Sequence, residues 1–299
     1  MLFSSLEFLY LFLPVALAVY FVCPARYRNG VILLFSLAFY GFGEPVYLFL
    51  MIAVVVIDHL FGRLIASRET GRRGILICAV AVNIGILFFF KYYAPFSEAL
   101  GFPHLEISLP LGISFYIFQA LSYVIDVYRR EVSPQKSLVG FGAYVTLFPQ
   151  LVAGPIVRYS DVQAELEKRE VEIWGVASGI ATFSAGLLKK VLLANGAGEC
   201  AEAMLSKGES TASMWLGLIA FSFQIYYDFS GYSDMAIGLG RMLGFSFPQN
   251  FNYPYISQSI TEFWRRWHIT LSSWFREYVY IPLGGNRRGR LRQILNLLA

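Results

Sequence analysis

The stretch TEFWRRWHITLSSW, residues 261–274, brings a histidine, two adjacent arginines and three tryptophans together in an otherwise apolar chain. Tryptophan and arginine side chains of this kind anchor a helix at a membrane surface, where the guanidinium groups contact lipid phosphates. Anchoring does not need a histidine, yet His268 stands among the polar residues of the stretch. Two interpretations therefore stay open, a membrane anchor and a site that binds a ligand, and one helix could serve both.

A single amphipathic helix is expected to carry these residues. It should begin at Ser259, because Ser259 and Glu262 match the S-x-x-E capping box. Glu262 also lies four residues before Arg266, close enough for an ion pair. Helical spacing predicts one face formed by Phe263, Trp267, Thr270, Trp274 and Tyr278, and another formed by Thr261, Arg265, His268, Ser272 and Arg276.

A second group of polar residues lies in QIYYDFSGYSDMAIGLG, residues 224–240, where Asp228 and Asp234 interrupt an apolar run. A carboxylate inside a membrane is costly, so it usually faces a protein interior or a water-filled cavity and has a cationic partner. One interpretation is an internal ion pair with Arg265 or Arg266. The other is that the same pairs line a passage for a substrate.

The solvent for these groups is indicated by the composition. The 299 residues are 57% hydrophobic and only 15% charged, whereas a soluble domain is about one quarter charged. The sequence therefore predicts a membrane protein. Its net charge of +4 is distributed over short loops and forms no basic domain, so nucleic acid is not an expected partner. Three cysteines are expected to be small buried apolar residues without a disulfide or a metal: Cys23, Cys78 and Cys200.

Apolar runs that could form membrane helices recur along the whole chain, without a repeat or a linker, which predicts one domain over residues 1–299. The first is the uncleaved N-terminal run 1–23. The others are 31–43, 45–61, 74–90, 107–125, 138–153, 176–194, 212–229 and 231–244, the last two separated at Ser230-Gly231. The mixed-charge segment 157–172 is predicted to be an amphipathic helix outside the hydrocarbon, and Lys189 and Lys190 are expected to extend toward the membrane surface.

Loop charge predicts the orientation. Up to residue 155, alternate loops carry nearly all the basic residues, and such loops usually face the cytoplasm. Nine basic residues lie on one side and only Lys91 lies on the other, which places the N-terminus outside and a turn at Gly43-Glu44-Pro45 outside. The nine are Arg26, Arg28, Arg63, Arg68, Arg72, Arg73, Arg129, Arg130 and Lys136.

Several function classes have no support in the sequence. It contains no Gly-x-x-x-x-Gly-Lys phosphate loop, no zinc-ligand spacing and no Gly-x-Ser-x-Gly elbow. An ATP-driven pump and a serine hydrolase therefore lack their motifs, and no metal site is expected.

Longer motifs carry a family resemblance. The blocks YYDFSGYSDMAIGLG and NFNYPYISQSITEFWRRWHITLSSWFREYVYIPLGGNR resemble the membrane-bound O-acyltransferase family, in its bacterial alginate O-acetyltransferase branch. The stretches FSSLEFLYLFLP, FKYY, LPLGISFYIFQALSYVIDVYR and LFPQLVAGPIVR are similar to the same branch. The resemblance covers nearly the whole chain.

This resemblance implies an all-α polytopic protein of the bacterial inner membrane, a ring of tilted helices around a passage with short interfacial helices at the cytoplasmic face. It implies that an acyl group passes from a cytoplasmic thioester donor, such as acetyl-CoA or an acyl carrier, to hydroxyls of an exported polysaccharide such as alginate. No cofactor stays bound. Membrane lipid and periplasmic acetyltransferase proteins are the implied partners. Donor or substrate binding would fall to Trp264, Arg265, Arg266, Trp267, Asp228, Asp234, Ser272 and Arg276.

One departure concerns the catalytic histidine. The family's usual histidine lies in a downstream Trp-His-Gly block, and the sequence ends at RQILNLLA before any such block. We therefore expect a chain truncated at its C-terminus and inactive as it stands. His59 and His104 do not match the motif, so His268 is the candidate base that takes the proton of the attacking hydroxyl.

Two other function classes stay open. Asp228 and Asp234 inside the membrane would also suit a transporter or an export component for a polysaccharide or small solute, without acyl-transfer chemistry. A noncatalytic membrane scaffold is the third possibility. Donor-dependent acetylation of a polysaccharide would separate the enzyme from both.

Overall fold

The computed structural model describes residues 2–100, 108–152, 154–208, 210–287, 289, 294 and 296. In this part of the chain the regular structure is entirely helical and contains no strand, which confirms the all-α prediction. The α-helices are α1 Leu13–Val22, α2 Arg28–Gly43, α3 Leu48–Ser67, α4 Arg72–Leu100, α5 Ile113–Arg129, α6 Leu138–Val145, α7 Tyr159–Glu167, α8 Ile173–Leu188, α9 Asn195–Lys207, α10 Thr211–Met242, α11 Ile260–Arg266 and α12 Ile269–Phe275. Short π- or 3₁₀-helical segments are η1 Phe8–Phe12, η2 Ala25–Tyr27, η3 Lys189–Ala194, η4 Pro254–Ile256 and η5 Arg276–Tyr280.

Within the described residues, three helical stretches are long and apolar enough to cross a membrane: Leu48–Ser67, Arg72–Tyr93 and Ile173–Ser206. A helix of about 20 apolar residues spans the hydrocarbon core, so these stretches agree with the membrane protein that the composition predicts. Other predicted runs form shorter helices. The run 138–153, for example, is helical only in α6. The predicted ring of tilted helices stays a prediction.

The chain divides into two compact units, which are described separately. Unit 1 comprises Met1–Val22, Ala153–Pro155 and Arg169–Ile269. Unit 2 comprises Cys23–Val152, Ile156–Lys168 and Thr270–Ala299. The prediction of one membrane domain over residues 1–299 is not tested by this division and stays a prediction.

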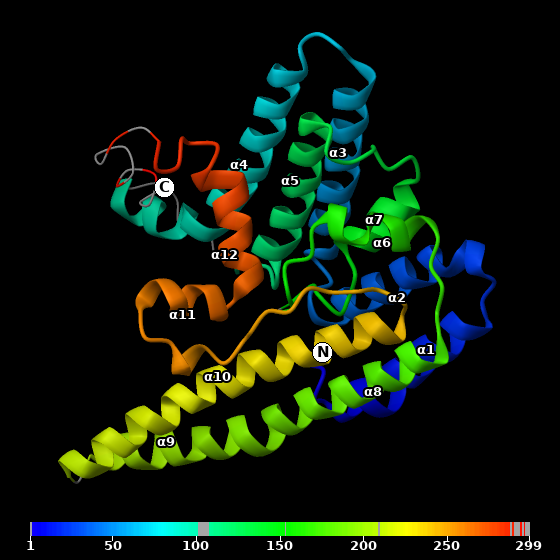
Figure 1. Ribbon diagram of the computed structural model, residues 1–299. Helices are drawn as coiled ribbons and strands as arrows, with labels where there is room; N and C mark the ends of the chain where they lie inside the picture. The colour runs from blue at the N-terminus through cyan, green and yellow to red at the C-terminus, as the bar shows by residue number, and fades with distance from the viewer. Residues whose placement is uncertain are drawn as a thin grey trace. The chain divides into compact units, whose positions relative to one another are not determined.

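In unit 2, α5 packs against α3 and α4, and the three helices lie side by side in Figure 1. The predicted turn at Gly43-Glu44-Pro45 separates α2 from α3. The amphipathic segment 157–172 forms α7, whose buried residues Tyr159, Val162 and Leu166 follow helical spacing. The apolar character of each segment thus determines which face it buries.

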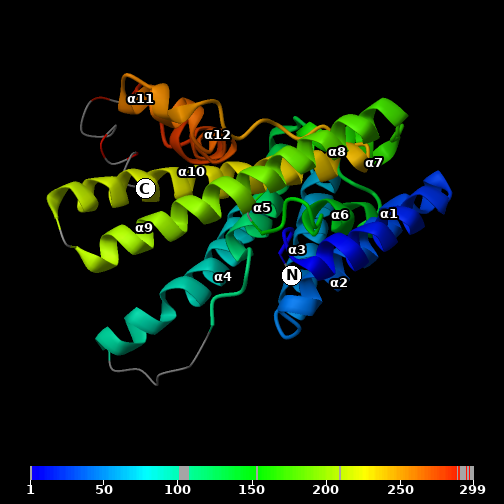
Figure 2. The same cartoon turned by 90° about the horizontal axis from the view of Figure 1, so that it is seen from below.

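In unit 1, α8, η3 and α9 form one rod that runs beside α10, as Figures 1 and 2 both show. The two rods approach closely through glycines. A Cβ atom on Gly186 would lie 2.5 Å from the Gly231 carbonyl oxygen, and one on Gly238 would lie 2.5 Å from the Phe183 nitrogen. Small residues of this kind allow helix backbones to pack closely inside membranes.

The predicted break at Ser230-Gly231 is wrong, because α10 continues through it to Met242. Gly231 is required here by packing and not by a turn, since a Cβ atom on it would lie 2.8 Å from the Gly186 carbonyl oxygen. One long helix therefore carries both Asp228 and Asp234.

We call Gly186, Gly231 and Gly238, where the two rods approach closely, the glycine seam, and it gives a stability prediction. Gly238→Ala should lower the thermal midpoint and the folded yield in detergent, because its methyl group must push two backbones apart, at a cost of about 1–3 kcal/mol. Gly196→Ala is the matched control, since apart from its own helix backbone no described atom lies within 4 Å of that Cβ position. Alanine there should be neutral or stabilising. Equal midpoints for the two variants would contradict the close approach of α8 and α10.

Candidate functional site

The histidine-containing stretch is not one continuous helix, which corrects the predicted faces. Ser259 caps α11 as expected, because its hydroxyl accepts from the Glu262 backbone nitrogen at 3.1 Å. The helix then ends at Arg266. Trp267 is extended, and His268 has a left-handed backbone with φ of 44° before α12 begins. The predicted faces are therefore divided between two separate helices.

The break is stabilised by the preceding segment, residues 250–252. The Ile269 nitrogen donates to the Asn250 carbonyl oxygen at 3.0 Å, and the Asn252 nitrogen donates to the Arg266 carbonyl oxygen at 2.9 Å. These backbone groups would otherwise have lost their helical partners at the break. A non-glycine residue with positive φ is uncommon and marks a position that its surroundings hold in place.

His268 is buried inside unit 1, with 7% of its surface exposed. Its Nδ1 lies 3.0 Å from Asn250 Oδ1, and its ring stands edge-on to Phe229 with a centroid distance of 4.8 Å. A carboxamide oxygen only accepts hydrogen bonds, so Nδ1 carries the proton and Nε2 keeps its lone pair. His268 lies outside the three candidate membrane spans, and burial lowers its pKa to about 4. At neutral pH it is therefore an uncharged imidazole that can accept a proton.

The tryptophans of the stretch have different environments. Trp267 packs in an aromatic cluster, 5.1 Å from the Phe251 ring and 5.6 Å from the Phe263 ring. Trp264 is 50% exposed. Trp274 is buried in unit 2, where its indole nitrogen donates to the Phe118 carbonyl oxygen at 3.1 Å. Of the three, only Trp264 presents half of its surface outward, as a surface anchor or a ligand contact requires.

Of Arg265, Arg266 and Arg276, the described part of the chain shows an ion pair for Arg266, whose partner is Glu262 at 2.9 Å. It also donates to the Asn252 carbonyl oxygen at 3.3 Å, so it helps to hold the break. Arg265 and Arg276 are exposed, and Ser272 is half-buried. The Glu262 pairing is confirmed, whereas the proposed pairing of an arginine with Asp228 or Asp234 is wrong.

The two carboxylates of α10 instead have lysine partners. Lys189 lies 2.5 Å from Asp234, and Lys190 pairs with Asp228. Both lysines are engaged in ion pairs, and their extension toward the membrane surface stays a prediction. Both lysines begin the π-helical segment η3, where the glycine seam brings the rod close to α10. Each carboxylate thus has a cationic partner within unit 1, as expected, and the interpretation in which such pairs line a passage stays a prediction.

A charge exchange tests the ion pair between Lys189 and Asp234. Lys189→Asp alone places two carboxylates together and should lower the folded yield and thermal midpoint in detergent. Adding Asp234→Lys should restore most of both, because the reversed pair occupies the same place. A double variant no better than the single one would show that the pairing does not stabilise the helices.

Unit 2 contains a cluster of polar side chains that was not predicted from the sequence. Arg158 forms an ion pair with Asp161 at 3.1 Å and a second ion pair with Glu277. Asp126, 1% exposed, accepts from the Tyr278 hydroxyl at 2.9 Å with both carboxylate oxygens. The available signal was Asp126 itself, a carboxylate within the otherwise apolar run of α5.

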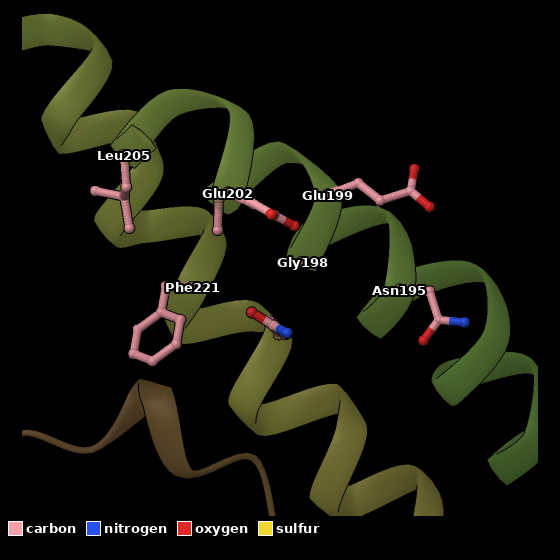
Figure 3. A pocket seen from close by; sticks show the side chains of 8 residues that line it. Asn195, Gly198, Glu199, Glu202, Leu205 and Phe221 are labelled. Carbon is pink, nitrogen blue, oxygen red and sulfur yellow. The ribbon is translucent and has the colours of Figure 1, made fainter. Parts of the chain in front are cut away.

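A pocket of 510 Å³ lies between α9 and α10 in unit 1. Figure 3 shows the side chains of Asn195, Glu199 and Glu202 extending from α9, and that of Phe221 extending from α10. None of the residues proposed for chemistry lines it. The described residues contain no group of three or more His, Cys, Asp or Glu side chains that could hold a metal ion.

The cysteines and the two remaining histidines were also considered in the sequence. Cys23, Cys78 and Cys200 are free thiols, but Cys78 and Cys200 are exposed on the described chain, so their predicted burial is wrong. His59 is buried in α3. His104 lies outside the described residues.

Comparison with known proteins gives consistent matches. The profile of the membrane-bound O-acyltransferase family matches residues 127–299. The chain is 43% identical to the probable alginate O-acetylase of Azotobacter vinelandii, over 100% of this chain and 62% of that protein. It is also 43% identical to the probable alginate O-acetylase of Pseudomonas aeruginosa, over 99% of this chain and 60% of that protein. The peptidoglycan O-acetyltransferase of Helicobacter pylori is 34% identical, over 100% of this chain and 64% of that protein. The chain thus spans about three fifths of the length of these relatives.

Proposed function

Since this chain belongs to the membrane-bound O-acyltransferase family, we propose that its protein transfers an acetyl group to hydroxyls of an exported polysaccharide such as alginate. The donor is a cytoplasmic thioester, acetyl-CoA or an acyl carrier, which acts as a substrate and not as a bound cofactor. The observation that carries this proposal is the 43% identity with an alginate O-acetylase over 100% of the chain.

His268 is assigned to the proton transfer. The acceptor hydroxyl oxygen attacks the thioester carbonyl carbon, and its proton passes to the Nε2 lone pair of His268. The tetrahedral adduct then expels the thiolate, which takes the proton from the imidazolium. One ester bond forms, one thioester bond breaks, and nothing is oxidised or reduced. The bond from Nδ1 to Asn250 orients the ring in the manner of the third member of a catalytic triad.

Donor contacts are assigned to the exposed side chains of the stretch. Arg265 and Trp264, both in unit 1, face outward on the described chain and can hold a carbonyl or anionic group of the donor. Arg276, in unit 2, is also exposed and is proposed as a separate donor contact. Four of the remaining candidates, Arg266, Trp267, Asp228 and Asp234, are reassigned to structural support. The half-buried Ser272 stays a proposed donor contact.

The proposed location is the bacterial inner membrane, with the N-terminus outside and the basic loops inside, next to membrane lipid and periplasmic acetyltransferase partners. In a background where Cys23, Cys78 and Cys200 are alanine, a cysteine at Ser4 should react with an impermeant maleimide in intact cells. A cysteine at Thr70, in the loop between α3 and α4, should react only after the cells are opened. External labelling at Thr70 would reverse the proposed orientation.

The proposed reaction is tested in a strain that lacks its own acetylation gene and carries the gene of this protein. Acetyl esters on the exported polysaccharide, measured by nuclear magnetic resonance, should return with this gene and stay absent with an empty vector. Normal export of a polymer without esters would contradict the proposed reaction. Restored export in an export-deficient strain, without any esters, would favour the transport alternative.

A further inference from the structure

Two helices of unit 2 that are long and apolar enough to cross a membrane, α3 and α4, are joined by a pair of buried polar side chains. Asp58 and Asn83 are each 1% exposed. The Asn83 amide nitrogen donates to Asp58 Oδ1 at 2.8 Å and to the Ala79 carbonyl oxygen at 3.0 Å. Both amide hydrogens are therefore used, and the pair connects the two helices within the candidate spans Leu48–Ser67 and Arg72–Tyr93.

Each residue of the pair also has one side-chain oxygen that forms no hydrogen bond. Asp58 Oδ2 and Asn83 Oδ1 are buried and form no hydrogen bond. An ionised carboxylate offers only acceptors, as does a carboxamide oxygen, so neither atom can satisfy the other. Leaving buried polar atoms unsatisfied is costly, and a cause is expected for each one in a native protein.

No charged neighbour compensates Asp58. Within the described ranges it makes no ion pair, and Arg63, further along α3, is exposed. His59, the next residue on α3, packs its ring against Phe141 of α6 at 5.7 Å. On α5 the titratable neighbour is Tyr123, whose hydroxyl accepts from the Gln135 nitrogen at 3.0 Å. An ionised Asp58 would therefore be an isolated charge inside the membrane, which is strongly disfavoured.

We propose that Asp58 is a proton-binding site of the membrane interior. The proton sits on Oδ2 and is donated to Asn83 Oδ1, which closes an acid–amide pair with two reciprocal hydrogen bonds. A single proton thus gives a hydrogen bond to both unsatisfied oxygens and removes the negative charge of Asp58. The pair holds α3 to α4, and loss of the proton breaks one hydrogen bond and leaves a charge in its place.

The decisive variant is Asp58→Asn, because asparagine has the same shape and supplies an N–H donor where the proton would lie. An amide–amide pair with Asn83 needs no titratable proton, so this variant should fold with the wild-type yield. Asn83→Leu is the contrasting variant, since it leaves the acid without a partner and should lower the yield. Failure of Asp58→Asn to fold would contradict the proposal.

Two measurements on detergent-solubilised full-length protein test whether Asp58 carries a proton. Wild type should show the infrared carbonyl band of a protonated carboxylic acid, and this band should lose intensity in Asp58→Asn. Because the folded state keeps a proton that the unfolded chain releases near pH 4, wild-type stability should fall relative to Asp58→Asn as the pH rises. An unchanged band, or a stability difference that does not vary with pH, would overturn the proposal.

Discussion

Replacing His268 with asparagine should lower the rate of acetyl-ester formation by about 10² to 10⁴ while the protein stays folded. The backbone of His268 has φ of 44°, and asparagine tolerates this left-handed conformation better than most residues. The variant therefore removes the base and keeps the helix break. The rate is measured as esters per polymer, normalised to the amount of inserted protein. Undiminished ester formation by His268→Asn would assign His268 to structure alone.

The pH profile separates a base from a structural residue. Burial lowers the pKa of His268 to about 4, so the wild-type rate should stay level as the pH falls through 6.5 and decline only near the lowered pKa. Asn250→Asp is the matched variant, because a carboxylate beside Nδ1 favours the imidazolium. It should move the acid limb of the profile to higher pH. A limb that does not move would contradict proton transfer through His268.

The same lowered pKa makes the folded protein sensitive to acid. The unfolded chain binds a proton at His268 near pH 6.5, whereas the folded chain does so near pH 4. Stability that is present above pH 6.5 is therefore lost as the pH falls through this window. His268→Asn should lack this part of the acid sensitivity.

The second large effect is expected in unit 2, where Tyr278→Phe should lower the thermal midpoint in detergent. Both carboxylate oxygens of the buried Asp126 accept from the one tyrosine hydroxyl. A hydrogen bond to a charged group contributes about 1.5–3 kcal/mol, and its loss leaves the carboxylate unsatisfied. The change removes a single oxygen atom and keeps the ring that packs at 5.2 Å against Trp274.

A double variant distinguishes the lost hydrogen bond from lost packing. Asp126→Leu combined with Tyr278→Phe removes both polar partners, so the midpoint should recover toward that of wild type. If the shift in thermal midpoint of the double variant equals the sum of the two single shifts, Asp126 and Tyr278 do not interact.

Local signals in the sequence predicted the parts of this region that depend on near neighbours. Ser259 was predicted to cap α11, and Glu262 to pair with Arg266, because both interactions span only three or four residues. The break at His268 could not be predicted in this way. It depends on hydrogen bonds from residues 250–252, which the helical pattern of the stretch does not report.

The partners of the α10 carboxylates show the same distinction. Composition indicated that Asp228 and Asp234 need cations, and this is correct. The choice of Lys190 and Lys189 over the arginines depends on how α8 and η3 align with α10 along the glycine seam. Helix alignment of this kind arises only when the chain packs.

The most direct test of the proposed acyl transfer follows the acetyl group itself. Membranes from cells that produce the protein and the polysaccharide are incubated with acetyl-CoA labelled in the acetyl group. Ester-linked label on the polymer is then counted after mild alkaline release. We expect label on the polymer with the full-length wild-type protein, and a decrease of about 10² to 10⁴ with His268→Asn. Equal labelling in membranes that lack the protein would contradict acetyl transfer by this protein.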